Sequence, residues 1–193
     1  MKVSVIVPTI ESRKELLKET LESVKNQTVQ PFEVLILREK VKAIAGKLNR
    51  GIEKSKGEAF IILADDDKLD PTYIEKTVKK MEETKADIVG TALENFGKYT
   101  GAHQFNRVPF ATSLVKKSMW EKVGGYDETI KIGEDADFYT MCINNGAKIE
   151  KVPEPLFIYR CHSVGKAERN WEEPNRLRQE KYRRLKYGYN PFT

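Results

Sequence analysis

Three consecutive aspartates, Asp65, Asp66 and Asp67, are the residues of this sequence that most clearly suggest chemistry. They directly follow the apolar run Ala59–Ala64, which predicts that they lie at the end of a buried strand. Adjacent carboxylates repel one another, and carboxylate oxygens are natural ligands for Mg²⁺ or Mn²⁺, which would relieve that repulsion. Because these ions are rarely enclosed by protein alone, a diphosphate on a bound ligand would complete the shell. The simpler alternative is an exposed acidic turn before a helix that opens at Pro71.

A second acidic cluster lies in Gly133–Asp137, at the start of another predicted helix. The helix macrodipole favours carboxylates in a first turn, and this alone would explain the cluster. The functional alternative is that Asp135 or Glu134 faces a cleft and acts as a general base.

A third group follows a predicted apolar strand. His162 is one of only two histidines in the chain and could be a metal or phosphate ligand. Arg160 and Lys166 lie close by in the sequence and could hold a phosphate. A structural role is the alternative for His162 and the expectation for His103.

The elements that must position these residues alternate between strand and helix in the first 91 residues. Hydrophobic periodicity predicts strands at Val3–Val7, Glu33–Leu37, Ala59–Ala64 and Asp87–Thr91, with helices at Ser12–Gln27, 42–55 and Pro71–Thr84 between them. Ser12 with Glu15 reads as a capping box, and Asp70 as an N-cap. This alternation predicts a doubly wound, mostly parallel α/β sheet, whose ligands gather where the strands end.

The second half has a less regular pattern. We expect residues 92–115 to be loop, with room for one short antiparallel strand. Further on, the predicted helices are Lys117–Val123 and Gly133–Asn145, the predicted strands Lys148–Val152 and Leu156–Arg160, and a last helix spans about Trp171–Tyr187.

The length of 193 residues predicts one domain, and a composition with 39% hydrophobic and 33% charged residues is ordinary for a globular protein. No apolar run approaches the roughly 20 residues of a membrane span, and Met1 leads directly into a strand-like segment instead of a signal peptide. We therefore expect a cytoplasmic protein. Cys142 and Cys161 lack the spacing of a zinc or redox motif, so we expect both to be reduced and structural.

The net charge of +5 is confined to the C-terminal end of the chain. Residues 160–193 contain nine Lys or Arg and four Asp or Glu, so the whole formal excess lies there, together with several aromatic residues. Such a segment could contact the anionic inner face of a membrane, although a solvated helix is an equally simple explanation. We expect no nucleic-acid binding, because no reader motif accompanies the charge.

The order of these motifs resembles that of the GT-A glycosyltransferases of inverting family 2. The opening VSVIVPTIESRKELLKETLESVKNQT is similar to the first strand, nucleotide-contacting loop and first helix of that family. AFIILADDDKLDP resembles the run into its D-x-D motif, and GGYDE followed by GEDADF resembles its acceptor-side segment. The resemblance covers about residues 3–165; each piece is weakly specific, but the ordered set is specific.

The resemblance implies a GT-A, Rossmann-like α/β fold and transfer of a sugar from a UDP- or GDP-sugar to a hydroxyl acceptor, either lipid-linked or a growing glycan. It further implies Mn²⁺ or Mg²⁺ and inversion at the anomeric carbon. On this basis residues 1–165 form the catalytic domain, with a nucleotide-binding half (1–91) and an acceptor half (92–165), and residues 166–193 form a basic aromatic tail.

Individual residues acquire expected roles from the same resemblance. Asp135 is the expected catalytic base, with Glu134 beside it. The expected nucleotide and phosphate contacts are Thr9, Glu11, Glu39, Lys47, Asp65, Arg160 and Lys166, and the expected metal ligands are Asp66, Asp67 and His162.

The chain departs from the family at three of these places. Arg38 and Glu39 stand where the family has paired aspartates, so Glu39 is the expected substitute and the base of the donor is left open. Leu48 replaces an arginine, and Lys47 could reach the phosphates instead. When the sequence is aligned on Pro71, the first aspartate of D-x-D is missing. Either Asp66 holds the metal while Asp65 contacts the ribose, or the pair is Asp65 and Asp67; we favour Asp66.

Other functions fit less well. A sugar nucleotidyltransferase would need a glycine-rich loop after the first strand, and TIESRK contains no glycine. A phosphatase with a catalytic aspartate pair would carry it after the first strand and not the third. The remaining alternative is a non-catalytic, glycosyltransferase-like module that binds nucleotide or glycan. The sequence predicts neither the sugar nor the oligomeric state.

Overall fold

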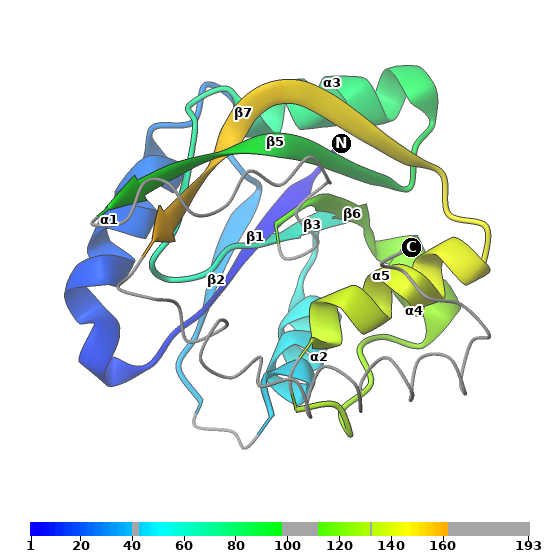
Figure 1. Ribbon diagram of the computed structural model, residues 1–193, viewed down its shortest axis with the longest axis horizontal. Helices are drawn as coiled ribbons and strands as arrows, with labels where there is room; N and C mark the ends of the chain where they lie inside the picture. Colours follow the sequence, from blue (N-terminus) through cyan, green and yellow to red (C-terminus); the bar gives the residue numbers. More distant parts are fainter. Residues whose placement is uncertain (40–42, 98–111, 132, 162–193) are drawn as a thin grey trace.

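A seven-stranded sheet with strand order β2-β1-β3-β6-β5-β7-β4 forms the centre of the protein. The computed structural model describes residues 1–39, 43–97, 112–131 and 133–161 (Figure 1). The strands are β1 (Val3–Pro8), β2 (Glu33–Leu37), β3 (Ala59–Ile62), β4 (Lys68–Leu69), β5 (Ile88–Gly97), β6 (Leu114–Lys116) and β7 (Ile149–Cys161). The helices are η1 (Glu11–Arg13), α1 (Lys14–Lys25), α2 (Ile44–Lys54), α3 (Tyr73–Thr84), α4 (Lys117–Val123) and α5 (Glu134–Asn144).

Both faces of the sheet are covered, which explains why β1 is apolar at almost every position. Side chains alternate between the faces of a strand, so Val5 packs in the cluster formed with α1 and α3, whereas Ile6 packs in the cluster formed with α2, α4 and α5. In Figure 1 the long β5–β7 ribbon arches over the shorter strands β1, β3 and β6. The α/β class with helices flanking the sheet is thus confirmed.

The sheet is mixed but mostly parallel, as the sequence predicted. β1 is parallel to both β2 and β3, and β5 is parallel to β7. In contrast, β6 is antiparallel to β3 and β5, and β4 is antiparallel to β7. Five of the seven strands in the described residues therefore run in one direction, and only β6 and β4 are reversed.

Three strands differ from their predicted surroundings or length. β2 was expected to be buried, but it lies at the edge of the sheet, and Val34 in it is 37% exposed. The strand predicted to end at Thr91 continues to Gly97 as β5. The two strand candidates near residues 148–160 form the single strand β7, which pairs with β5 through register shifts around Ala92.

The predicted helix starts are also corrected. Ser12 forms no capping box, because Glu11–Arg13 is a 3₁₀ turn and α1 begins at Lys14 without a side-chain cap. Asp70 accepts hydrogen bonds from the backbone N–H of Thr72 at 2.8 Å and from its hydroxyl at 2.6 Å, so it stabilises the turn before α3 and is not the N-cap itself.

The aspartate triplet lies in a connection that crosses the sheet. β3 is third in the strand order, whereas β4, which follows only five residues later, lies at the far edge against β7. Among the described residues no helix is long and apolar enough to cross a lipid bilayer. The predicted helix at about 171–187 and the tail 166–193 lie outside the described residues.

Candidate functional site

Thr9 and Asp65 bring the ends of two neighbouring strands together. β1 and β3 are parallel, so their carboxyl ends lie at the same edge of the sheet. The hydroxyl of Thr9 donates a hydrogen bond to Asp65 Oδ2 at 2.6 Å. Both residues are buried, with 3% of Thr9 and 2% of Asp65 exposed. Two of the residues expected to contact the nucleotide therefore lie side by side.

Arg13 is the residue that the sequence analysis missed. It ends the η1 turn, and its guanidinium forms two ion pairs, Nη1 with Asp65 Oδ1 and Nη2 with Asp66 Oδ2, each at 2.5 Å. The side chain of Asp66 is 14% exposed and that of Arg13 is 36% exposed. One sequence feature could have identified Arg13. It lies just after the first predicted strand, and the ends of the predicted parallel strands, including the one before the triplet, were expected to lie together.

Asp67 points into the protein. Its Oδ1 accepts the backbone N–H of Arg160 at 2.8 Å, and its carbonyl accepts the hydroxyl of Thr20 in α1 at 2.8 Å. Burial raises the pKa of the Asp67 carboxyl to about 7; the neighbouring charge of Asp66 adds to this rise, and the Arg160 N–H opposes it. Of the three aspartates, Asp66 has the most accessible carboxylate, whereas Asp67 anchors the loop.

Arg160 holds the triplet loop from the end of β7. Its Nε donates to the carbonyl of Asp66 at 2.8 Å, and its Nη2 donates to Glu19 Oε2 at 2.7 Å. The guanidinium lies over the ring of Phe96, 4.4 Å from the centroid. Hydrogen bonds from Lys68 and Arg160 lower the pKa of Glu19. These contacts connect Arg160 to α1, to β5 and to the triplet, and the expected contact with a phosphate stays a prediction.

Lys47 supports the same loop from α2. Its ammonium donates to the carbonyl of Thr9 at 2.8 Å, and the residue is 4% exposed. Burial lowers the pKa of Lys47, while the charges of Glu39 and Asp65 oppose that change. A buried cation beside Thr9 adds positive potential to a site that also contains the triplet.

Glu11 and Glu39, which were expected to contact the nucleotide, lie on the surface after β1 and β2. Glu11 forms a 3.7 Å ion pair with Arg38. Glu39 accepts hydrogen bonds from Arg50 Nη2 at 2.9 Å and Nε at 3.1 Å, and Arg50 lowers the pKa of Glu39. The contacts that place these two glutamates are thus with Arg38 and Arg50, and their roles toward a nucleotide remain predictions.

The second acidic cluster opens α5, as predicted. Burial raises the pKa of Glu134 to about 7, and the charge of Asp135 contributes. Asp135 Oδ1 accepts the backbone N–H of Ala136 at 2.8 Å. The buried phenol of Tyr126 lies close enough that both carboxylates help to raise its pKa, and its ring stacks on Phe138 at 4.3 Å between centroids. The pair is therefore packed against the loop that precedes α5.

Asn49 connects α2 to that loop. Its Nδ2 donates to the carbonyl of Tyr126 at 2.9 Å, and its Oδ1 accepts the N–H of Tyr126 at 2.8 Å and the indole N–H of Trp120 at 3.2 Å. Gly125 permits this close approach: its φ is +81°, and a Cβ there would lie 2.8 Å from Asn49 Oδ1. Because α2 also carries Lys47, one helix contacts both the loop after β1 and the loop before α5.

The triplet supplies carboxylates of the kind that bind divalent cations. Carboxylates are suitable ligands, and Asp66 is the accessible one. Within the described ranges, no group of three or more His, Cys, Asp or Glu residues has the arrangement of a metal centre. The chain's described residues thus fit a divalent ion as a partial shell, with Asp66 contributing. His162 and Lys166, which were expected to bind the metal and the phosphate, lie outside the described residues.

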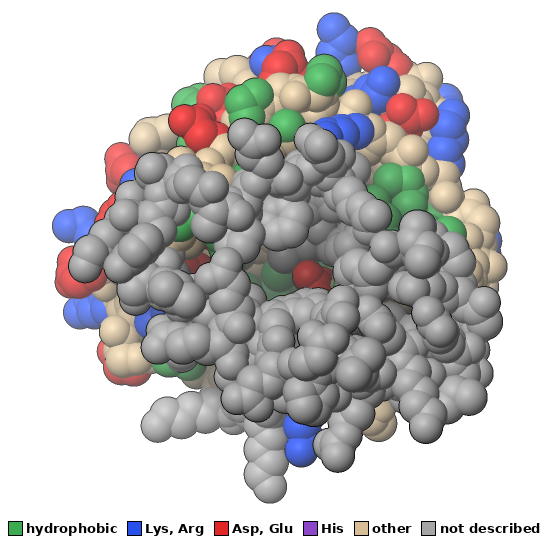
Figure 2. All heavy atoms as spheres, in the orientation of Figure 1, with side chains coloured by type: hydrophobic (Ala, Val, Ile, Leu, Met, Phe, Trp, Pro, Cys, Tyr) green, Lys and Arg blue, Asp and Glu red, His purple; other side chains and the backbone are tan. Residues whose placement is uncertain are grey.

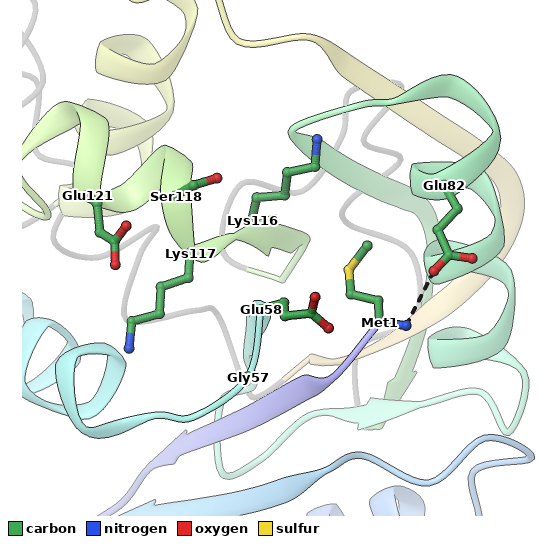
Figure 3. A pocket seen from close by; sticks show the side chains of 8 residues that line it. All are labelled: Met1, Gly57, Glu58, Glu82, Lys116, Lys117, Ser118 and Glu121. Atoms are coloured by element: carbon green, nitrogen blue, oxygen red, sulfur yellow. Dashed lines mark hydrogen bonds and ion pairs between the residues drawn. The ribbon is translucent and has the colours of Figure 1, made fainter.

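An open groove of about 540 Å³ lies near the amino ends of β1 and β3, whereas the site lies at their carboxyl ends (Figure 3). The groove is not part of the site. Glu58 precedes β3 and Lys116 ends β6, while the N-terminal ammonium forms a 3.3 Å ion pair with Glu82. Figure 2 shows acidic and basic side chains interspersed over the part of this face that the described residues form.

Comparison with known proteins agrees with this geometry. The profile of the family "Glycosyl transferase family 2" matches residues 35–142, which is more than half of the chain. Two curated relatives are the uncharacterized glycosyltransferases YwdF of Bacillus subtilis (strain 168) and MJ1057 of Methanocaldococcus jannaschii. Each is 26% identical; the alignments cover 86% and 82% of this chain and 76% and 70% of the relatives.

Solved structures of S. aureus TarS have a similar fold. The complex of TarS 1-349 with UDP gives a TM-score of 0.70 at 16% identity, over 83% of this chain and 61% of TarS 1-349. The complex with UDP-GlcNAc gives 0.72 at 15% identity, over 88% and 61%. The present chain thus spans about three fifths of TarS 1-349. From the family match and the shared fold, the chain belongs to glycosyl transferase family 2 and is a glycosyltransferase with the GT-A fold.

Proposed function

We propose that the protein is an inverting, metal-dependent glycosyltransferase that moves a sugar from a UDP- or GDP-sugar to a hydroxyl acceptor. The observation that carries this proposal is the convergence of Thr9, Lys47, Asp65 and Asp66 at the carboxyl edge of β1 and β3. This edge is where open α/β sheets bind nucleotides. The UDP complexes of TarS make a uridine donor the first to test.

On the donor side, Asp65 and Thr9 are buried together and suit the ribose and the first phosphate of the donor. Lys47 adds a fixed positive charge behind them. Glu39, which follows β2, is the residue we assign to recognition of the nucleobase. Glu11 lies on the loop that would cover the nucleotide.

Asp66 is the residue we assign to Mg²⁺ or Mn²⁺, with the donor diphosphate and His162 completing the shell. When bound, such an ion supplies Lewis-acid stabilisation of the charge that develops on the leaving diphosphate. The chain's own part is to hold the Asp66 carboxylate in place, which it does through the bond from Arg160 Nε to the Asp66 carbonyl and through the anchored Asp67.

Asp135 is the proposed base that takes the proton from the acceptor hydroxyl. The raised pKa of Glu134 means that this carboxyl keeps its proton up to about pH 7. Asp135, next to it at the start of α5, is therefore the carboxylate that we assign as the base. The deprotonated acceptor oxygen then forms a bond to the anomeric carbon from the face opposite the diphosphate, whose bond to that carbon breaks, and this gives inversion.

Residues 1–165 form the catalytic domain in this proposal, and the basic tail 166–193 places the cleft at an anionic membrane surface that carries a lipid-linked acceptor. Flotation with liposomes tests the second statement. The full chain should float with vesicles containing anionic lipid and not with neutral ones, and no flotation with either would refute it.

Release of nucleoside diphosphate from a panel of UDP- and GDP-sugars, with Mn²⁺, with Mg²⁺ and with EDTA, tests the activity. Asp66→Asn and Asp135→Asn should each reduce the rate by about 100-fold or more. Glu121→Gln, in the groove near the amino ends of β1 and β3, is the matched control and should retain the wild-type rate. Tight nucleotide binding without turnover of any donor would instead indicate the non-catalytic module.

A further inference from the structure

Arg13 is paired with Asp66, the carboxylate that the proposed function assigns to the cation, and with the neighbouring Asp65. Its Nη1 pairs with Asp65 Oδ1 and its Nη2 with Asp66 Oδ2, both at 2.5 Å. This is a fork that spans two adjacent side chains, a geometry that suits a guanidinium and not a lysine.

The fork leaves little of Asp65 for another ligand. Oδ2 of Asp65 accepts the hydroxyl of Thr9, and Oδ1 accepts Arg13. Asp66 is paired with Arg13 as well, through the carboxylate that is the most accessible of the three. A divalent cation bound to the same carboxylates would lie within a few ångströms of the guanidinium, where two positive charges repel strongly.

Arg13 is also placed so that it can move. It lies at the end of a short 3₁₀ turn, and its side chain is 36% exposed. The hydrogen bonds of its side chain to the described residues are the two of the fork. Arg160 is a useful contrast, because it is bonded to Glu19 and to the triplet loop and lies against Phe96. Arg13 can therefore leave the aspartates without disturbing the core, whereas Arg160 cannot.

We infer that Arg13 competes with the divalent cation for Asp66, so that the cation enters together with the nucleoside diphosphate and not before it. The inference rests on the proposed function. Without nucleotide, the fork neutralises the aspartates and metal affinity is low. Once a diphosphate is present, its oxygens offer Arg13 new acceptors, and the guanidinium gives up the carboxylates.

Titration with Mn²⁺, followed by the EPR signal of the free ion at pH 8, tests this without any turnover. The proteins are the wild type, Arg13→Met, and Lys79→Gln as a control with the same charge change on the exposed face of α3. Without nucleotide, Arg13→Met should bind Mn²⁺ at least tenfold more tightly than the wild type and Lys79→Gln should match the wild type. With saturating UDP or GDP, whichever binds, the gap should narrow to less than threefold.

Three outcomes would overturn the inference. The first is a folded Arg13→Met that binds Mn²⁺ no more tightly than the wild type without nucleotide. The second is a wild type whose Mn²⁺ affinity is the same with and without nucleotide. The third is that no protein binds Mn²⁺ even with nucleotide. In that case the metal dependence of the proposed function fails as well, whereas the first two outcomes refute only the role of Arg13. Should circular dichroism show that Arg13→Met is unfolded, Arg13→Lys replaces it; its ammonium contacts one carboxylate at a time, so a smaller gain in affinity is expected.

Discussion

Replacing Glu134 by glutamine should make the protein more stable at high pH, although this residue belongs to the proposed catalytic pair. Burial raises the pKa of Glu134 from an ordinary value of 4.5 to about 7. Between these two values the folded state binds more protons than the unfolded state, so stability falls as the pH rises. This rise in the pKa lowers the free energy of unfolding by about 3 kcal/mol. The loss is nearly complete at about pH 7 and changes little above it. Glutamine has no proton to lose and avoids this penalty.

Urea unfolding of both proteins, followed by circular dichroism from pH 4 to pH 8.5, measures the difference. Glu134→Gln should equal the wild type near pH 4 and exceed it by up to about 3 kcal/mol at pH 8. Glu53→Gln, which changes an exposed carboxylate on α2, should show no such slope. A difference for Glu134→Gln that does not vary with pH, or that favours the wild type as the pH rises, would refute the reasoning. Loss of transfer activity in the more stable variant would agree with its functional assignment.

Three further substitutions test the positioning of the site. Gly125→Ala should lower stability by about 2 kcal/mol or more, because alanine is strained at a φ of +81° and its Cβ would meet Asn49; urea unfolding measures this, and an unchanged midpoint would contradict it. Thr9→Val should lower stability by about 1–3 kcal/mol by removing a hydrogen bond to the buried Asp65, whereas Thr9→Ser should keep it; equal thermal midpoints would argue against the bond. Lys47→Met should change stability little but weaken nucleotide affinity about tenfold by calorimetry, and unaltered affinity would remove Lys47 from the site.

Local patterns in the sequence predicted the elements that depend on local residues. Helix α4 has the predicted bounds, and β2 does as well, because apolar spacing and flanking glycine or proline define such segments. The position of Asp65 after a buried strand was also predictable, because an apolar run precedes it. Parallel strands end at a common edge of the sheet. The meeting of Asp65 with Thr9 follows from the same rule.

Features that depend on distant partners were not predictable in this way. The length of β5 and the continuity of β7 arise from their pairing with one another, and the exposure of β2 arises from its place at the edge. Arg13 was missed because a charged residue beside a helix start is ordinarily solvated, and its partners lie more than fifty residues away in the sequence. The inward turn of Asp67 depends on Arg160, which is more distant still.

The connection that carries the aspartate triplet is tethered at both ends. On one side it leaves β3, which pairs with β1; on the other it enters β4, which pairs with β7. The backbone bond from Arg160 to Asp67 adds a second attachment to the β7 side. With so few residues between the two attachments there is no slack, so any tilt of the β5–β7 arch relative to the β1–β3 block must pull on the carboxylates. The spacing of the aspartate carboxylates would therefore depend on the orientation of the β5–β7 strand pair relative to the β1–β3 pair.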